Sequence, residues 1–238
     1  MIQDDYYLNI EADAFFDRWH SKNSLFDGKI RASKKDIFLK LEQENLFSKE
    51  KKVLEVGCFI GDLLSNIKNQ YKCDVFGVET SAKACKLSKE LYDLILENNS
   101  FIKSSYFHFN QDSKNFFDLI IFDDVLSWMS RNNILQVIAI TDWMLKEGGS
   151  IFLRDFSPSF SFAYENHHQK GNNIFNFKQS NGHRQFFFKS GMYYEKSTSV
   201  YIEKNLQKVI TERPDSSIWS DTILTKCKQP LHPVLDLS

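Results

Sequence analysis

The sequence is poor in residues that break regular structure and has no excess of either charge. Only 4 prolines and 9 glycines occur in 238 residues, so no obvious linker divides the chain, and we expect a single domain over residues 1–238. Lysine and arginine number 30 against 31 aspartates and glutamates. Proteins that hold nucleic acid through its phosphates usually have a basic excess, so we expect no nucleic-acid partner.

Closely spaced cysteines and long apolar runs are also absent. The four cysteines lack the close pairing of a zinc or redox motif, so we expect free thiols and no metal site. No stretch approaches the roughly 20 apolar residues of a membrane span. The first residues are acidic, whereas a signal peptide begins with basic ones. These absences predict a soluble, cytoplasmic protein with no membrane partner.

What the sequence does contain is an alternation of helical and strand patterns. Helical spacing covers residues 13–47, 62–71, 82–93 and 132–145. Short apolar runs cover residues 51–58, 73–80, 116–125 and 150–156, with a weaker run at 100–103. This alternation predicts an α/β fold with a doubly wound, mostly parallel sheet covered on both faces.

The pattern changes beyond Pro158. Residues 166–191 are polar and contain two isolated glycines, which predicts a loop-rich insertion. Residues 192–203 and 221–227 read as strands that would add antiparallel to one edge of the sheet. We therefore expect a helical N-terminal lid over 1–50, a ligand-binding core over 51–158, and the insertion with its edge strands over 159–238.

Glycines follow the first predicted strand, in the stretch EVGCFIG at residues 55–61. A glycine turn lets a ligand approach the backbone, and the helix start beyond it supplies unpaired N–H groups. The dinucleotide fingerprint places its first and last glycines about five residues apart. Gly57 and Gly61 are four apart, which argues against a nicotinamide-dependent dehydrogenase.

Carboxylates end two further strands. Glu79 closes the second strand, 18 residues after Gly61, where it could accept hydrogen bonds from both hydroxyls of a ribose. The alternative is that Glu79 only caps the helix that begins near Ser81. Asp123 and Asp124 close the run FDLIIFDD, either as ligand-binding groups or as ordinary strand-end residues.

Together these motifs, over residues 51–155, resemble those of class I S-adenosylmethionine-dependent methyltransferases. The glycine stretch is similar to the family's E/D-x-G-x-G-x-G motif, with Phe59 in place of the middle glycine, and FDLIIFDDVLSWM is similar to its fourth-strand motif. The resemblance implies a seven-stranded, Rossmann-like sheet, an enzyme, and S-adenosylmethionine as its cofactor. It also implies cofactor contacts from Glu55, Gly57, Cys58, Phe59, Gly61, Glu79, Thr80, Ser105, Tyr106 and Asp123.

The acceptor would bind between parts outside that core. The predicted lid offers Tyr6, Tyr7, Phe15, Phe16, Arg18 and Trp19. The insertion offers Glu165, Asn166, His167, His168, Lys170, His183, Arg184 and Lys189. An oxygen acceptor usually needs a general base, for which the candidates are Asp124, His167, His168 and His183, although solvated loop histidines are the alternative.

The cations of the insertion favour a small anionic acceptor, such as a nucleotide-linked sugar or another phosphorylated metabolite. The FFDRW segment at residues 15–19 also looks like bacterial methyltransferases of surface-glycan biosynthesis, which suggests polysaccharide biosynthesis. Two alternatives stay open. One is a nucleic-acid ribose methyltransferase, since the N/D-P-P-Y and Pro-Cys motifs of base methylation are absent. The other is a non-catalytic methyltransferase-like subunit, which Phe59 favours.

Overall fold

The computed structural model describes residues 3–22, 28–104, 111–166, 171, 174–202 and 218–229. Its main sheet has seven strands in the order β3-β2-β1-β4-β5-β9-β8. The parallel strands are β1 (Lys52–Val56), β2 (Asp74–Glu79), β3 (Glu97–Asn98), β4 (Phe117–Asp123) and β5 (Leu145–Phe156). The antiparallel strands are β9 (Ile218–Lys226) and β8 (Tyr193–Ile202). The predicted mostly parallel, seven-stranded α/β sheet is confirmed.

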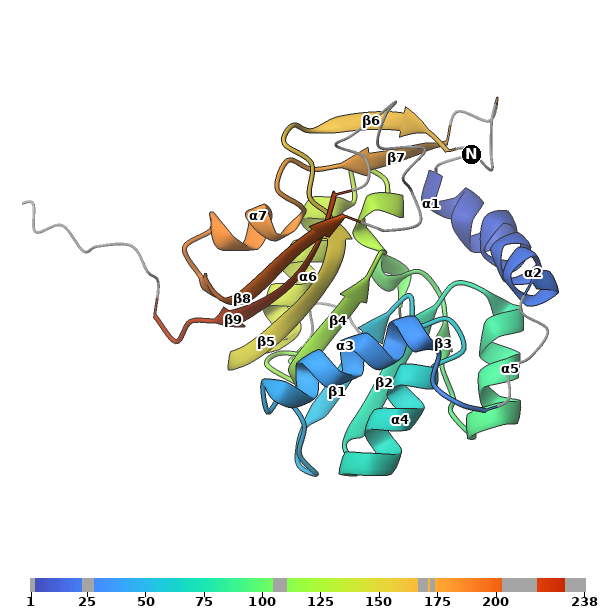
Figure 1. Cartoon of the computed structure of the whole chain (residues 1–238), viewed down its shortest axis with the longest axis horizontal. Coiled ribbons are helices and arrows are strands. Elements are labelled where there is room, and N and C mark those ends of the chain that lie inside the picture. The colour runs from blue at the N-terminus through green and yellow to red at the C-terminus, as the bar shows by residue number, and fades with distance from the viewer. Residues whose placement is uncertain are drawn as a thin grey trace, which may run out of the picture.

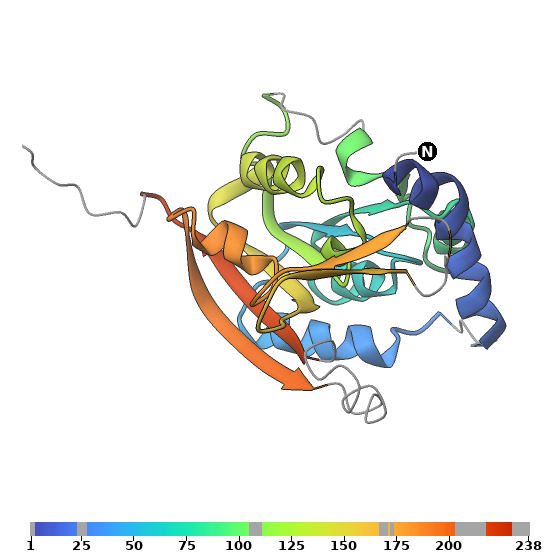
Figure 2. The same cartoon turned by 90° about the horizontal axis from the view of Figure 1, so that it is seen from above.

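Helices cover both faces of the sheet. In Figure 1, α3 (Ala32–Gln43), α4 (Asp62–Tyr71) and α5 (Ala82–Tyr92) lie in front of it. Figure 2 shows α6 (Ile134–Met144) on the opposite side from α3, with the sheet between them. The doubly wound arrangement predicted from the alternating pattern is therefore confirmed.

The strand sequences explain this layering, because neighbouring residues of a strand face opposite ways. On β1, Val53 packs in the cluster that includes the apolar side chains of α3 and α4. Leu54 and Val56 pack in the cluster that includes those of α6. Glu55 shares the face of Val53, so this acidic residue is directed toward α3.

The N-terminal segment lies over the carboxyl edge of the sheet (Figure 1). It consists of α1 (Gln3–Tyr6), the π-helical turn η1 (Tyr7–Glu11) and α2 (Ala12–Lys22). Asp13 docks it on α5, accepting hydrogen bonds from Ser81 Oγ at 2.7 Å and Lys83 N at 3.2 Å. The helical pattern predicted over residues 13–47 therefore belongs to two separate helices, α2 and α3.

Two predictions were wrong in detail. The weak strand expected at residues 100–103 is β3, three residues earlier, and Phe101–Lys103 form the 3-10 turn η2 because Phe101 turns into the core. The insertion is not only loop, since β6 (Phe162–Glu165) and β7 (Phe175–Lys178) pair as a hairpin, followed by the short helix α7 (Arg184–Phe188). Within the described residues, no helix is long and apolar enough to cross a membrane.

Candidate functional site

The loop after β1 is built on left-handed backbone. Gly57, Phe59 and Gly61 have φ angles of 68°, 53° and 72°. A Cβ atom on Gly57 would lie 2.6 Å from Val125 Cγ2, so only glycine fits there. Phe59 adopts a conformation that costs a residue with a side chain about 1–2 kcal/mol.

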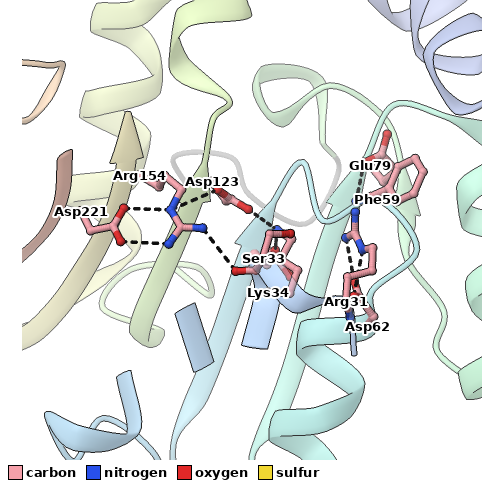
Figure 3. Close-up of polar contacts among 10 residues, drawn as sticks. Arg31, Ser33, Lys34, Phe59, Asp62, Glu79, Asp123, Arg154 and Asp221 are labelled. Atoms are coloured by element: carbon pink, nitrogen blue, oxygen red, sulfur yellow. Dashed lines mark hydrogen bonds and ion pairs between the residues drawn. The ribbon is translucent and has the colours of Figure 1, made fainter. Parts of the chain in front are cut away.

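The side chain of Phe59 contacts the N-terminal segment. Its ring centroid lies 6.1, 5.6 and 6.0 Å from those of Phe15, Phe16 and Trp19. The Arg31 guanidinium lies 4.8 Å from the same centroid (Figure 3). Aromatic and cation–π contacts of this kind offset the backbone strain. The residue that departs from the glycine motif thus anchors α2 on the loop.

Glu79 lies at the end of β2 and ties this loop to the next strand. Its Oε2 accepts a hydrogen bond from Phe59 N at 2.7 Å, and its Oε1 accepts one from Ser81 N at 2.8 Å. Burial raises the pKa of Glu79, and these backbone donors oppose the rise. Ser81 itself caps α5 by accepting a hydrogen bond from Ala84 N. Glu79 thus faces both the loop and the start of α5, and it lines a cleft.

A buried ammonium separates the two acids of the predicted site. Lys34 Nζ on α3 lies 2.5 Å from Glu55 Oε1. It also lies 2.8 Å from Asp123 Oδ2, and Figure 3 shows Lys34 beside Asp123. Burial raises the pKa of Glu55 to about 7 although Lys34 acts to lower it. Burial lowers the pKa of Lys34, but the charges of Asp123 and Glu55 outweigh it, so Lys34 stays charged. Sequence reasoning missed Lys34.

A second ion-pair network continues from this group toward the last strands. Arg154 on β5 donates two hydrogen bonds to Asp221 on β9, at 2.8 and 2.9 Å. Lys40 also pairs with Asp221, and Tyr201 Oη donates to it at 2.9 Å. Figure 3 shows Arg154 between Asp221 and Asp123. The charged groups form one row along the carboxyl ends of β1, β4 and β5 and the amino-terminal half of the antiparallel β9.

A cleft of about 1070 Å³ runs along this row. One part of its lining, here called the glycine-loop arm, consists of Lys34, Gly57, Phe59, Glu79, Thr80, Asp123 and Val125. The other part, here called the edge-strand arm, consists of Lys40, Arg154, Tyr201, Trp219 and Asp221. Asp124 and Trp128 line the cleft beside both arms. Three of the predicted lid residues, Tyr7, Phe15 and Trp19, also line it.

A smaller, mostly apolar pocket of about 130 Å³ adjoins the glycine-loop arm. Its lining includes Val78 from β2 and Asn99, Phe101 and Ile102 from the segment after β3. Sequence reasoning missed these residues because it placed the third strand too late. The predicted contacts Ser105 and Tyr106 lie outside the described residues.

Two of the predicted contacts point elsewhere. The Cys58 side chain is fully buried and its Sγ donates to Val78 O at 3.7 Å, so it lies in the core. A Cβ atom on Gly61 would lie 3.1 Å from Ser88 Oγ, so this glycine lets the loop pack on α5. Cys58 and Gly61 therefore shape the loop through the backbone.

Asp124 combines backbone strain with an unusual proton affinity. Its φ angle is 54°, and its N–H donates to Arg154 O at 2.9 Å. Burial, followed by the charges of Asp123 and Asp155, raises its pKa well above the usual carboxyl value. A cleft-lining carboxyl group of raised pKa suits general base chemistry.

The insertion contributes less to the cleft than predicted. His183 is buried with its Nδ1 2.5 Å from Asp155 Oδ2, and neither is among the described residues that line the cleft. Arg184 donates to Thr222 Oγ1 at 3.0 Å, and Lys189 also lies outside that lining. His167, His168 and Lys170 lie outside the described residues.

Asn166, from the insertion, reaches the N-terminal segment. Its Nδ2 donates to Tyr7 Oη at 2.8 Å and to Asn176 Oδ1 at 2.9 Å. The Tyr7 ring in turn meets Trp128 edge-on, with centroids 6.0 Å apart. The β6–β7 hairpin and the N-terminal segment (α1, η1 and α2) are thus connected. Together they are here called the roof of the cleft.

The remaining predicted residues make contacts within the N-terminal segment or within the insertion. Arg18 pairs with Glu11, and the Tyr6 ring meets Tyr7 edge-on. Glu165 accepts a hydrogen bond from Gly171 N within the insertion. Among the described residues, no three His, Cys, Asp or Glu side chains gather in a way that could hold a metal ion.

Comparison with sequence families gives one match, which covers more than half of the chain. A family model described as a methyltransferase domain matches residues 26–192. No curated protein matches the chain by sequence.

Several solved structures with a similar fold are methyltransferases. An S-adenosylmethionine-dependent methyltransferase from Methanosarcina mazei has a TM-score of 0.58 and 14% identity, covering 79% of this chain and 98% of that one. Burkholderia thailandensis 1,6-didemethyltoxoflavin-N1-methyltransferase, bound to its acceptor and S-adenosylhomocysteine, has a TM-score of 0.65 and 12% identity, covering 94% and 91%. The N-methyltransferase NodS from Bradyrhizobium japonicum, also with S-adenosylhomocysteine, has a TM-score of 0.56 and 12% identity, covering 80% and 84%.

Proposed function

The chain belongs to the class I S-adenosylmethionine-dependent methyltransferases, and from that membership we propose that it methylates a small acceptor at an oxygen atom. The cofactor supplies a methyl group on a positively charged sulfur. The protein has to hold the donor, align the acceptor oxygen with the methyl group, and remove the oxygen's proton.

The observation that carries the proposal is the Glu79 carboxylate, buried at the cleft and fixed by Phe59 N and Ser81 N. In this position it would accept hydrogen bonds from the ribose hydroxyls. The apolar pocket of about 130 Å³ beside it, lined by Val78, Phe101 and Ile102, suits the adenine ring.

The methionine end of the cofactor would lie at Gly57, where the lack of a side chain leaves the backbone open. Among the described residues, Glu55 Oε2 is buried with no hydrogen-bond partner, which leaves an acceptor for an ammonium group. Lys34 would balance the charges of Glu55 and Asp123 and donate to the carboxylate group of the cofactor's methionine part. Lys34, Glu55 and Asp123 would thus bind the methionine end of the cofactor together.

We assign the general base to Asp124. Its carboxyl group lines the cleft next to Asp123, and burial together with the nearby acids raises its pKa. A base of raised pKa binds a proton from an acceptor hydroxyl more readily than an ordinary carboxylate does. The roof formed by α1, η1, α2 and the hairpin would exclude water from this step.

The first test is isothermal titration calorimetry of the protein with S-adenosylmethionine and S-adenosylhomocysteine. We expect micromolar binding of both, and no binding of NAD. Glu79→Ala should weaken it about a hundredfold, because two charge-assisted hydrogen bonds are lost. Glu90→Ala, on the exposed side of α5, is the matched control and should bind normally.

Absence of binding for both sulfur ligands would contradict the proposed function. Equal affinity of the Glu79→Ala variant and the wild type would leave cofactor binding intact and contradict the assignment of Glu79.

A further inference from the structure

Apart from Lys40 on α3, the edge-strand arm consists of side chains from β5, β8 and β9. In the antiparallel register, Trp219 on β9 lies opposite Phe156 on β5 and Tyr201 on β8. Arg154 lies opposite Asp221 two pairs further along. Alternation places all five side chains on the sheet face that carries Glu55 and Asp123. The arm is therefore continuous with the glycine-loop arm along one face.

Every lysine and arginine that lines the described cleft is paired with a carboxylate. Arg31 pairs with Asp62, and Lys34 pairs with Glu55 and Asp123. Lys40 and Arg154 pair with Asp221.

Burial raises the pKa of Asp221, but the hydrogen bonds and charges of Arg154 and Lys40 outweigh it and hold that pKa below its usual value. Asp221 is therefore ionised at neutral pH. A phosphate in this arm would lie next to the carboxylates of Asp221 and Asp123, at a cost in like-charge repulsion.

A neutral hydroxyl group meets no such conflict. Within the described part of the chain, Arg154 uses three of its five N–H groups, two on Asp221 and one on Ser33 O, which leaves two donors. Carboxylate oxygens of Asp221 and Asp123 can accept from a hydroxyl. Because a hydroxyl both donates and accepts, it satisfies an ion pair without breaking it.

The aromatic residues add an apolar wall. Trp219 packs on Phe156 with ring centroids 3.8 Å apart, which fixes its orientation. Tyr201 lies across from Trp219 and lines the same cleft. Pockets that combine aromatic walls with a few fixed polar groups bind small polar molecules whose ring faces are apolar.

We infer that the edge-strand arm is the acceptor subsite and that it binds a neutral, hydroxyl-bearing ring such as a sugar, not a phosphate ester. This inference rests on the proposed function. It also replaces the anionic acceptor predicted from the insertion, because the described lysine and arginine residues of that segment, Lys178, Arg184 and Lys189, do not line the cleft.

Saturation-transfer NMR tests the inference on protein loaded with S-adenosylhomocysteine. The probes are glucose, galactose and mannose, each compared with its 6-phosphate. We expect at least one neutral sugar to receive saturation and its 6-phosphate to bind no more tightly. Trp219→Ala should weaken that sugar's binding about tenfold, which corresponds to about 1.4 kcal/mol. Trp219→Phe should retain most of it.

Binding of S-adenosylhomocysteine, measured on each variant, separates the two proposals. Tyr194→Ala, an exposed aromatic residue on β8 outside the cleft, is the matched control and should bind both ligands normally. If Trp219→Ala loses S-adenosylhomocysteine binding through misfolding, Tyr201→Phe supplies the test, since it removes only the hydroxyl that donates to Asp221 and should weaken sugar binding.

Tighter binding of a 6-phosphate, or no sugar binding by protein that binds S-adenosylhomocysteine, would overturn the inference and leave the proposed function standing. Failure to bind S-adenosylhomocysteine would overturn both.

Discussion

The two arms of the cleft hold their charges in different surroundings. In the glycine-loop arm, Lys34 contacts Glu55 and Asp123 with its side chain only 5% exposed and that of Glu55 fully buried. In the edge-strand arm, Lys40 pairs with Asp221 while its side chain is 36% exposed. The first ion pair belongs to the packed interior between α3 and the sheet, and the second borders solvent.

This difference in burial predicts that the ion pairs of Lys34 contribute more to stability than the ion pair of Lys40 does. Removing one partner of a buried ion pair leaves an uncompensated charge in the interior, whereas an exposed pair contributes little. The glycine-loop arm is therefore part of what holds the domain together. In the edge-strand arm, Lys40 can be replaced at little cost to folding, because Asp221 keeps its ion pair with Arg154.

The largest effect is expected from a substitution that removes the buried ion pairs of Lys34. Lys34→Met should lower the free energy of unfolding by about 3–5 kcal/mol, because Glu55 and Asp123 lose their shared cation. Lys40→Met is the matched control and should cost less than about 1 kcal/mol. Urea unfolding of both variants checks this. Similar losses would remove the distinction between the two arms.

Asp124, where the arms meet, should affect turnover without affecting folding. Asp124→Asn should lower kcat about a hundredfold, because the general base is lost. The raised pKa of Asp124 sets the direction of the pH effect. A base must be deprotonated, so kcat/KM should rise with pH through that pKa in the wild type, and this limb should be absent in Asp124→Asn.

Methyl transfer to the accepted sugar, followed with radiolabelled cofactor across pH, provides the measurement. Asp74→Asn, at the far end of β2, is the control. An unchanged pH profile in Asp124→Asn would assign the proton transfer to another residue.

The smallest effect concerns Phe59. Phe59→Gly relieves left-handed strain but removes the ring from Phe15, Phe16 and Trp19, with a net loss of about 2 kcal/mol. Because these contacts hold α2 rather than the core, the loss should be seen as faster proteolysis near Arg18. Phe160→Gly, at an exposed loop position, is the control. A more protease-resistant Phe59→Gly would mean that strain outweighs packing.

The same two regions differ in how far sequence predicts them. The glycine-loop arm follows from short contiguous stretches, because a glycine turn after a strand and an acid at the end of the next strand fix the backbone locally. Tyr201 and Trp219 meet only through the register of two strands, which no local pattern specifies. Lys34 stands beside the exposed Lys35, and only the packing of α3 on the sheet distinguishes them.

Other misses have local causes. The third strand pairs over just Glu97 and Asn98, too short a segment to show an alternating pattern. The hairpin within the insertion was hidden by polar residues between its strands. Its alternating aromatic residues, Phe162 with Tyr164 and Phe175 with Phe177, were the available signal.

The hydrogen bond from Asn166 to Tyr7 has a consequence for the order of folding. It joins residues 159 positions apart, so its two ends come within reach only after the sheet has formed. We expect the roof to be completed last during folding and to open first in the native protein, before the strands separate. The cleft would then admit its ligands through a local opening that leaves the core intact.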